Sequence, residues 1–250
     1  MKSPLRDPNK AQKGLATIKE LIPEKSTIHT FFLSFGTIEI PLAFHNRTVI
    51  SHTSCAPIYN FWHCVLRDPE RIANFVDDLF PPYSEKEFYL LQEQWTKAKD
   101  PFLRAALFFL LNRCSEAGNI SFGQMNINNF TSTGLSRLKN FEVFDFRILH
   151  DEAPLNVAFE KVNNSEYILL PAGNFSVSEK HKHLAPEDFF IPHQKLSDLL
   201  LKEEKKWVIT YNFHPEVTHL YKDKNIIMIN KFGMRTDNQK TCKELVIANF

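Results

Sequence analysis

The segment Tyr167–Phe175, with the sequence YILLPAGNF, decides the fold that we expect for this chain. Its first four residues are apolar and predict a short buried strand that ends at Leu170. Pro171 lacks a backbone N–H and Gly173 permits a positive φ, so we expect strand pairing to stop there and a tight turn to follow. Ligands of α/β proteins bind where such strands end. The turn is therefore the first place to look for a functional site.

Length and composition indicate a folded chain without a marked electrostatic character. The chain has 250 residues, of which 43% are hydrophobic, enough for one large domain or a domain with an inserted lobe. Lys and Arg total 30 and Asp and Glu total 29, so the net charge neither indicates nor excludes a nucleic-acid partner. Only 7 glycines are present, which disfavours a fold that wraps phosphates in glycine-rich loops.

The cysteines and the apolar pattern bear on metal sites and on location. Cys55, Cys64, Cys114 and Cys242 form no C-x-x-C pair, so we expect no zinc site and no other metal site. The sequence shows no signal peptide and no long apolar run. We therefore predict a cytoplasmic protein with free thiols and no membrane association.

The first half of the chain predicts a β-α-β unit followed by helices. We expect a helix over about 10–21, a strand over 29–34, a turn at Phe35 and Gly36, a helix to about 44 and a strand over 48–51. Residues 56–114 have helical periodicity. Within them, Asp100 and Pro101 predict an N-cap and first turn before a helix that is apolar on nearly all sides and therefore buried.

The second half predicts the rest of a sheet. Residues 115–133 are polar, rich in asparagine and typical of a loop or hairpin. Strands are expected at 141–146, 167–170, 207–211, 225–230 and 244–248, with helices over about 192–205 and 215–220. The fold class is thus α/β, a mixed Rossmann-like sheet with an inserted helical lobe. Residues 1–55 and 136–250 would form the sheet domain, and residues 56–135 the lobe.

Several segments also follow one another in an order that resembles one enzyme family. They are SPLRDP at 3–8, DPFLRAALFFLLNR at 100–113, Gly118 with 122–123, HQKL at 193–196, WVITYN at 207–212 and ELVIAN at 244–249. This order is similar to that of the Dam-type adenine-N6 DNA methyltransferases, the D12 class, over nearly the whole chain. The resemblance implies an S-adenosylmethionine-dependent methyltransferase fold, with the lobe corresponding to a target-recognition domain.

The cofactor motifs of that family are degraded here. The motif E-P-F-x-G-x-G corresponds to residues 30–36, where Ser34 replaces the first glycine, Phe35 would crowd the methionine part of S-adenosylmethionine, and only Gly36 remains. The opening G-G-K motif leaves Lys10 at most. The acidic residue that would accept hydrogen bonds from the ribose hydroxyls corresponds to His52, which has no carboxylate.

The catalytic motif is degraded as well. The family's D-P-P-Y corresponds to Pro171, Ala172, Gly173 and Asn174. The aspartate that would hold the adenine amino group is replaced, and so is the aromatic residue that would stack on a flipped base, unless Phe175 substitutes for it. We therefore expect no catalytic residues and no bound cofactor.

Each of these residues also has a purely structural interpretation. Gly36 is expected in a turn at a helix start, His52 at the surface end of a strand, and Phe175 in core packing. Arg113 could brace the polar loop beside it or touch a DNA phosphate, and the sequence leaves both open. The candidate DNA-binding residues are Lys10, Arg113, Asn126, Asn128, Arg137 and Lys139.

The functional prediction is a catalytically inactive Dam-like homologue that acts as a DNA-binding module or as a protein-interaction or structural module. The partner would be double-stranded DNA, bound weakly and mostly without sequence specificity, or a protein such as an active methyltransferase subunit. The alternative is a divergent active adenine-N6 DNA methyltransferase that uses S-adenosylmethionine.

Overall fold

A seven-stranded mixed sheet forms the centre of the molecule. The computed structural model describes residues 1–7, 11–79, 81–82, 84–142, 145–175 and 191–250. The strand order is β3-β2-β1-β4-β5-β7-β6, in which β1 to β5 are parallel and β7 runs antiparallel to both of its neighbours. The α/β class with a Rossmann-like sheet is confirmed. The strands are β1 (Thr27–Thr30), β2 (Thr48–Thr53), β3 (Phe146–His150), β4 (Tyr167–Gly173), β5 (Lys206–Asn212), β6 (Asn225–Asn230) and β7 (Cys242–Ala248).

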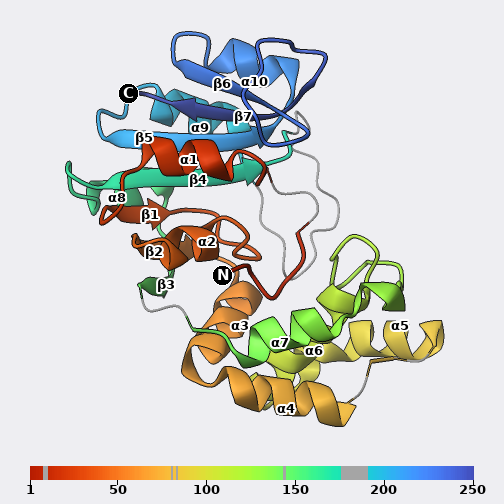
Figure 1. Cartoon of the computed structure of the whole chain (residues 1–250). Coiled ribbons are helices and arrows are strands. Elements are labelled where there is room, and N and C mark those ends of the chain that lie inside the picture. Colours follow the sequence, from red (N-terminus) through yellow and green to blue (C-terminus); the bar gives the residue numbers. More distant parts are fainter. Residues whose placement is uncertain (8–10, 80, 83, 143–144, 176–190) are drawn as a thin grey trace.

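Helices cover both faces of this sheet (Figure 1). On one face, α1 (Leu15–Leu21) and α2 (Glu39–Phe44) pack on the apolar side chains of the strands in one core. On the other face, α8 (Leu155–Glu160), α9 (His193–Leu200) and α10 (Pro215–Leu220) bury a second core. In β4, Leu169 belongs to the first core, whereas Ile168 and Leu170 belong to the second. Burial on both faces explains why the parallel strands are continuous apolar runs.

A group of helices separates β2 from β3 along the chain and lies beside the sheet (Figure 1). Within residues 56–135, the described part pairs as a β-structure only at the isolated bridge between Ser115 and Met125. The division into domains at residues 55 and 136 stays a prediction. The helices are α3 (Ala56–Arg67), α4 (Pro69–Leu79), α5 (Glu85–Gln94), α6 (Pro101–Cys114) and α7 (Ser132–Lys139), with single 3-10 turns η1 (Trp95–Lys97) and η2 (Ile127–Asn129).

Helix α6 organises this group because its side chains are buried continuously from Ala105 to Cys114. It begins as the sequence predicts, with the Asp100 carboxylate accepting hydrogen bonds from the N–H groups of Phe102 and Leu103 at 2.7 and 3.1 Å. Near its other end, Asn112 exchanges hydrogen bonds of 2.8 and 2.9 Å with the backbone of Arg6. The N-terminal segment is thereby fastened to the helical group.

Two strand boundaries differ from the prediction. The strand expected at 141–146 is β3, which begins at Phe146 and pairs with β2 from Val49 onward. Phe141 is buried instead in the core of the helical group, directly after α7, and residues 143–144 lie outside the described part. β4 does not stop at Leu170 but pairs Pro171 with Thr210 of β5 and continues to Gly173.

Strand geometry explains why Pro171 is tolerated within β4. The carbonyl of Leu169 accepts a hydrogen bond from Phe31, so the backbone groups of Leu169 and, two residues on, of Pro171 are directed toward β1. β1 ends at Thr30, so no ladder partner faces the missing N–H of the proline.

One strand and two helices also have boundaries that differ from the prediction. The strand expected over 29–34 ends at Thr30, because Phe32 has a φ of 67°, which a strand does not accommodate. The first helix begins at Leu15 rather than near residue 10, and residues 13–14 form a turn before it. The helix expected over 192–205 ends at Leu200, after which the Lys205 N–H bonds to the Glu203 carboxylate in the following turn.

The cap of α6 is a direct test of this packing. Asp100→Ala should destabilise the protein by about 1 kcal/mol, because it removes the acceptor of two N-terminal N–H groups. Urea unfolding followed by circular dichroism measures the change. Asp100→Asn keeps an acceptor and is the matched control. Equal stability of the alanine and wild-type proteins would contradict the assignment of Asp100 as the cap.

Candidate functional site

The carboxyl ends of β1, β2, β3 and β4 meet at one edge of the sheet. The chain order reverses between β1 and β4, whose neighbours lie on opposite sides, and this is the position at which doubly wound folds bind ligands. The residues predicted from the degraded motifs lie at this edge. Residues 31–36 follow β1, His52 is the penultimate residue of β2, and residues 171–174 lie at the end of β4.

The turn after β1 is closed by a tryptophan of α3. The Trp62 indole N–H donates a hydrogen bond of 2.8 Å to the Ser34 carbonyl. Gly36 has a φ of 66°, and a Cβ at this position would lie 2.5 Å from Cζ2 of Trp62. The Phe35 ring packs near Phe108 of α6, at 6.2 Å between ring centroids. Gly36 is therefore required by the packing of Trp62 against the turn, in agreement with its structural interpretation.

His52 is not the exposed strand-end residue that we expected from the sequence. It is 5% exposed and stacks on Phe31 with 4.5 Å between ring centroids and 14° between ring planes. Its position at the end of β2 was predicted correctly, but its burial was missed because α8 covers this face of the sheet there. Phe31 and Phe159, also in contact, complete the apolar surroundings.

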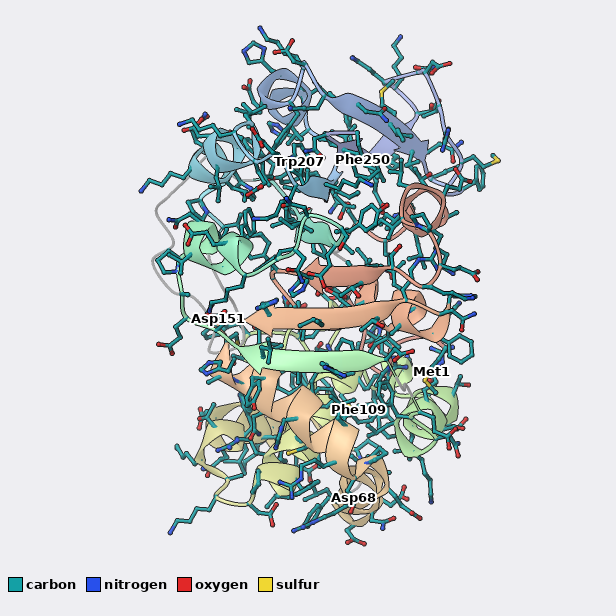
Figure 2. The ribbon with its side chains drawn as sticks, turned by 90° about the vertical axis from the view of Figure 1, so that its left-hand side faces the viewer. Met1, Asp68, Phe109, Asp151, Trp207 and Phe250 are labelled. Carbon is teal, nitrogen blue, oxygen red and sulfur yellow. The ribbon has the colours of Figure 1, made fainter. Side chains whose placement is uncertain are left out.

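His52 takes part in a polar chain beneath the edge. Nε2 of His52 lies 3.1 Å from Nδ1 of His29, and Nε2 of His29 lies 3.2 Å from Oε2 of Glu166. At the other end, Nδ1 of His52 lies 3.6 Å from Oδ2 of Asp151, which is 3.6 Å from Nζ of Lys161. Figure 2 shows Asp151 just beyond the end of β3.

Two neutral histidines have too few protons for all three contacts of this chain. The shortest carboxylate contact, to Glu166, calls for N–H at Nε2 of His29. His52 then donates through Nε2 to His29 and presents an unprotonated Nδ1 to Asp151. This assignment explains why Nδ1 of His52 is buried without a hydrogen-bond partner and stands at 3.6 Å from the carboxylate.

Burial keeps these histidines neutral. Burial is the main cause that lowers the pKa of His52 to about 4, followed by the neighbouring His29, while Asp151 acts in the opposite direction. Burial also lowers the pKa of His29, against the effect of Glu166. The edge that would need a carboxylate for a ribose therefore presents a neutral imidazole packed on an aromatic ring.

A small pocket lies beside His52 and Asp151 of this polar chain. It has a volume of about 160 Å³ and is lined by Phe31, Phe32, His52, Asp151 and residues between Glu152 and Ala158. Pockets that bind ligands of drug size measure about 300–1000 Å³. The Asp151 carboxylate is already engaged by Lys161. This volume suits a few water molecules better than a nucleoside.

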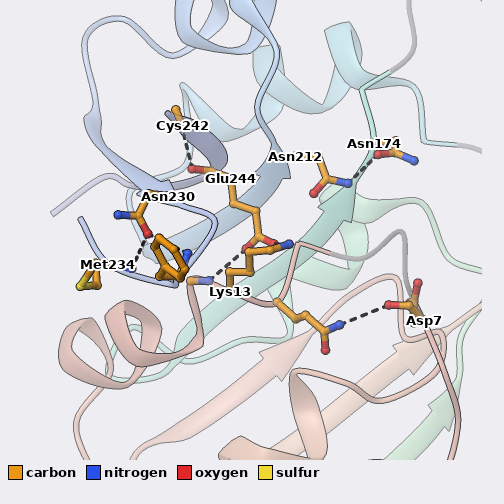
Figure 3. Close-up of polar contacts among 11 residues, drawn as sticks. Asp7, Lys13, Asn174, Asn212, Asn230, Met234, Cys242 and Glu244 are labelled. Carbon is orange, nitrogen blue, oxygen red and sulfur yellow. Dashed lines mark hydrogen bonds and ion pairs between the residues drawn. The ribbon is translucent and has the colours of Figure 1, made fainter. Parts of the chain in front are cut away.

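The turn after β4 is fixed by a hydrogen bond from the neighbouring strand β5. The Asn212 side chain of β5 donates a hydrogen bond to the Asn174 side-chain oxygen (Figure 3). The Phe175 ring lies 5.0 Å from His193 and 4.8 Å from His214, centroid to centroid, and packs against the second core. The packing interpretation of Phe175 therefore agrees with the structure, and no carboxylate occurs among residues 171–175.

The predicted DNA-binding residues are dispersed. Arg113 makes the bracing contacts of one alternative: its Nη2 donates to the Asn129 carbonyl and to Oγ1 of Thr131 at 2.9 and 3.0 Å, and its side chain is buried. Its contact with a phosphate stays a prediction. Lys139, Asn126 and Asn128 lie on the surface of the helical group, with Asn126 half-buried. Lys10 lies outside the described residues.

Arg113 and Arg137 nevertheless line one pocket, which the sequence did not predict. It has a volume of about 570 Å³ and lies between the N-terminal segment, α1, α2, α6 and α7. Its lining includes Lys2, Arg6, Lys13, Arg113 and Arg137. Lys2 and Arg6 were missed as pocket residues because they belong to an N-terminal segment whose path depends on Asn112, more than a hundred residues away from Arg6 in the chain.

The described residues contain neither a candidate metal site nor a membrane-spanning helix. Among the described residues, no group of three or more His, Cys, Asp and Glu side chains is placed to hold a metal ion. In the same part of the chain, no helix is both long enough and apolar enough to span a bilayer. All four cysteines are free and buried.

The buried histidine chain predicts acid sensitivity. The pKa of His52 is lower in the folded state than its ordinary value of 6.5. The unfolded protein therefore takes up this proton first, so the free energy of unfolding is highest above about pH 6.5 and decreases as the pH falls toward about 4. His52→Gln should reduce this loss by about 1–3 kcal/mol. Urea unfolding at several pH values measures it. His219→Gln, at an exposed histidine, is the control and should follow the wild-type curve. An unchanged pH dependence in His52→Gln would contradict the burial of a neutral His52.

Comparison with known proteins agrees with this architecture. A family model described as the D12 class N6 adenine-specific DNA methyltransferase matches residues 12–170, which is more than half of the chain. No curated protein matches the sequence. The matched region runs from the segment before α1 to β4 and includes the turn after β1, the helices α1 to α8 and the histidine chain. The chain therefore belongs to the D12 class of N6 adenine-specific DNA methyltransferases.

Proposed function

We propose that this chain is a D12-class member that does not transfer methyl groups and uses the fold to bind duplex DNA. The observation that carries the first half is His52, which stands where the family has an acidic residue. It is buried, neutral and stacked on Phe31. The binding half rests on family membership and on the arginines beside the helical group.

The geometry at the edge of the sheet supports the proposal that S-adenosylmethionine does not bind there. A ribose is held by two hydroxyl hydrogen bonds to one carboxylate, and an imidazole offers a single acceptor at most. Here that acceptor, Nδ1 of His52, is buried. The Phe31 ring fills the space beside it, and about 160 Å³ remains open.

The residues at the end of β4 support the proposal that the methyl group is not transferred to adenine. The adenine amino nitrogen must be held by an acceptor while it attacks the methyl group. Asn174 presents an amide, whose oxygen accepts a hydrogen bond from Asn212. The preceding residues, Pro171 to Gly173, are part of β4 and have no polar side chain. The family match ends at residue 170, just before this turn.

One observation favours the alternative, a divergent active enzyme. Asp151 and Glu152 follow β3 at the same edge and line the small pocket, so a carboxylate is present near the ribose position. Asp151 is engaged by Lys161 and accepts a hydrogen bond from the Ala153 N–H, which together with Lys161 lowers its pKa. A cofactor would have to displace these contacts.

Positive side chains support DNA binding. Arg137 makes no hydrogen bond or ion pair with the described residues, so its guanidinium is available to a phosphate. Asn126 and Asn128 do not line the arginine pocket. Phosphate contacts carry affinity but no sequence information. Binding is therefore expected to be weak, dependent on salt and mostly independent of sequence.

A methyl-transfer assay tests the catalytic half of the proposal. Unmethylated duplex DNA is incubated with S-adenosylmethionine that carries a tritiated methyl group. Because residues 171–175 carry no carboxylate that could hold the adenine amine, we expect incorporation equal to that of a reaction without protein. An active D12-class enzyme is the positive control. Incorporation that grows with protein concentration and disappears in Asn174→Ala would establish the active alternative.

A salt titration tests the binding half. Fluorescence anisotropy with a labelled duplex should give a binding constant that falls steeply with salt concentration. Arg137→Ala should weaken binding. It should also reduce the steepness of log K against log salt by about one, the change expected when one phosphate contact is lost. Asn128→Ala is the control and should change neither value. Absence of binding even at low salt would remove DNA as the partner and leave a protein partner for the retained fold.

A further inference from the structure

The pocket beside α7 is unusual in its uncompensated positive charge. Five of its lining residues are Lys or Arg and one, Asp7, is acidic. Nζ of Lys13 lies 3.3 Å from the carboxylate of Glu244, which is 1% exposed and also accepts a hydrogen bond from the Gly14 N–H (Figure 3). With Lys13 paired and Asp7 offsetting one further charge, three positive charges stay uncompensated among the described residues that line the pocket.

The buried member of this set is Arg113. It is 7% exposed, and its Nε is buried without a hydrogen-bond partner. No carboxylate acts on it. Burial, with the nearby positive charges of Arg6 and Arg137, lowers its pKa to about 10. A buried guanidinium beside two others is costly unless an anion completes the site.

The absence of a side chain at Gly134 makes room for this guanidinium. The group packs on Gly134 in the first turn of α7, where a Cβ would lie 2.9 Å from Cζ, Nε and Nη2 of Arg113. Arg6 is held by hydrogen bonds from its guanidinium to the carbonyls of Ser115 and Glu116, at 2.9 and 3.3 Å. Two of the three arginines are thus fixed in position before any ligand arrives, which reduces the entropic cost of binding.

We propose that this pocket binds the terminal phosphate of a nucleotide or of a phosphorylated strand end, held by Arg6, Arg113 and Arg137. A terminal phosphate monoester carries nearly two negative charges at neutral pH, whereas a phosphate within a DNA strand carries one. The higher charge matches the three uncompensated cations better. Guanidinium groups bind such oxygens with two parallel hydrogen bonds.

Size and lining also fit a phosphate with an organic group attached. The volume of about 570 Å³ exceeds what a phosphate alone needs and lies within the range of small-ligand sites. Leu5, Leu15 and Pro41 supply an apolar wall for a sugar or base. This inference rests on the proposed binding role and deepens it, because it names the pocket and the kind of phosphate.

The test compares four probes by calorimetry and anisotropy: AMP, adenosine, a short duplex with 5′-phosphates and the same duplex with 5′-hydroxyls. We expect AMP to bind and adenosine not to bind, or the phosphorylated duplex to bind more tightly than the hydroxyl duplex. The first result identifies a free nucleotide as the source of the phosphate, and the second a strand end.

Three variants locate the binding. Arg137→Ala should weaken the favoured probe about tenfold, since a hydrogen bond to a charged group is lost. Lys139→Ala removes the same charge from the same helix outside the pocket and should change affinity little. Gly134→Ala keeps every charge but displaces the Arg113 guanidinium, and should also weaken binding. Thermal unfolding of each variant shows whether it folds.

The outcomes separate this inference from the proposed function. Equal binding of both duplexes with no binding of AMP would overturn the terminal-phosphate site and leave DNA binding intact. Binding of AMP that Arg137→Ala weakens, with no binding of either duplex, would support the site and overturn DNA binding. Equal losses in Arg137→Ala and Lys139→Ala would show diffuse attraction and overturn the site.

Discussion

The parallel pairing of β1 with both β2 and β4 is the constraint on which the rest of the structure depends. It brings the ends of four strands to one edge, although these strands are separated in the chain by up to about a hundred residues of helix and loop. Because parallel strands require crossovers on the faces of the sheet, the same pairing places α2 on one side and α8 on the other. The residues that correspond to the family's cofactor and catalytic motifs, at 31–36, 52 and 171–174, lie where this pairing directs them.

At that edge the protein's own side chains occupy the available space. Phe31 and His52 stack, and the chain from Glu166 through His29 and His52 toward Asp151 is covered by α8. On the opposite side of β1, Trp62 closes the turn that contains Ser34 and Gly36. These contacts stabilise the folded state by burying aromatic area. A cofactor would gain access only by displacing them, and this supports the proposal that the fold is kept here without the family's reaction.

The sequence predicted the parts of the structure that depend on local pattern. The N-cap at Asp100, the buried helix after it and the apolar strands β4 and β5 follow from propensity and periodicity. The end of β4 was predicted wrongly, because whether Pro171 can pair depends on where β1 ends. The burial of His52 was missed for a similar reason: it depends on α8, about a hundred residues later. The arginine pocket was missed because an N-terminal segment and two helices supply its charges together.

The central claim is that the edge of the sheet no longer accepts the methyl donor, and calorimetric titration of the purified protein with S-adenosylmethionine tests it most directly. The account predicts heats equal to those of dilution up to about 1 mM, the upper end of the range in which enzymes usually bind their substrates. A saturable isotherm with one site per chain would contradict it, because the pocket of about 160 Å³ beside His52 would then have to open for a nucleoside.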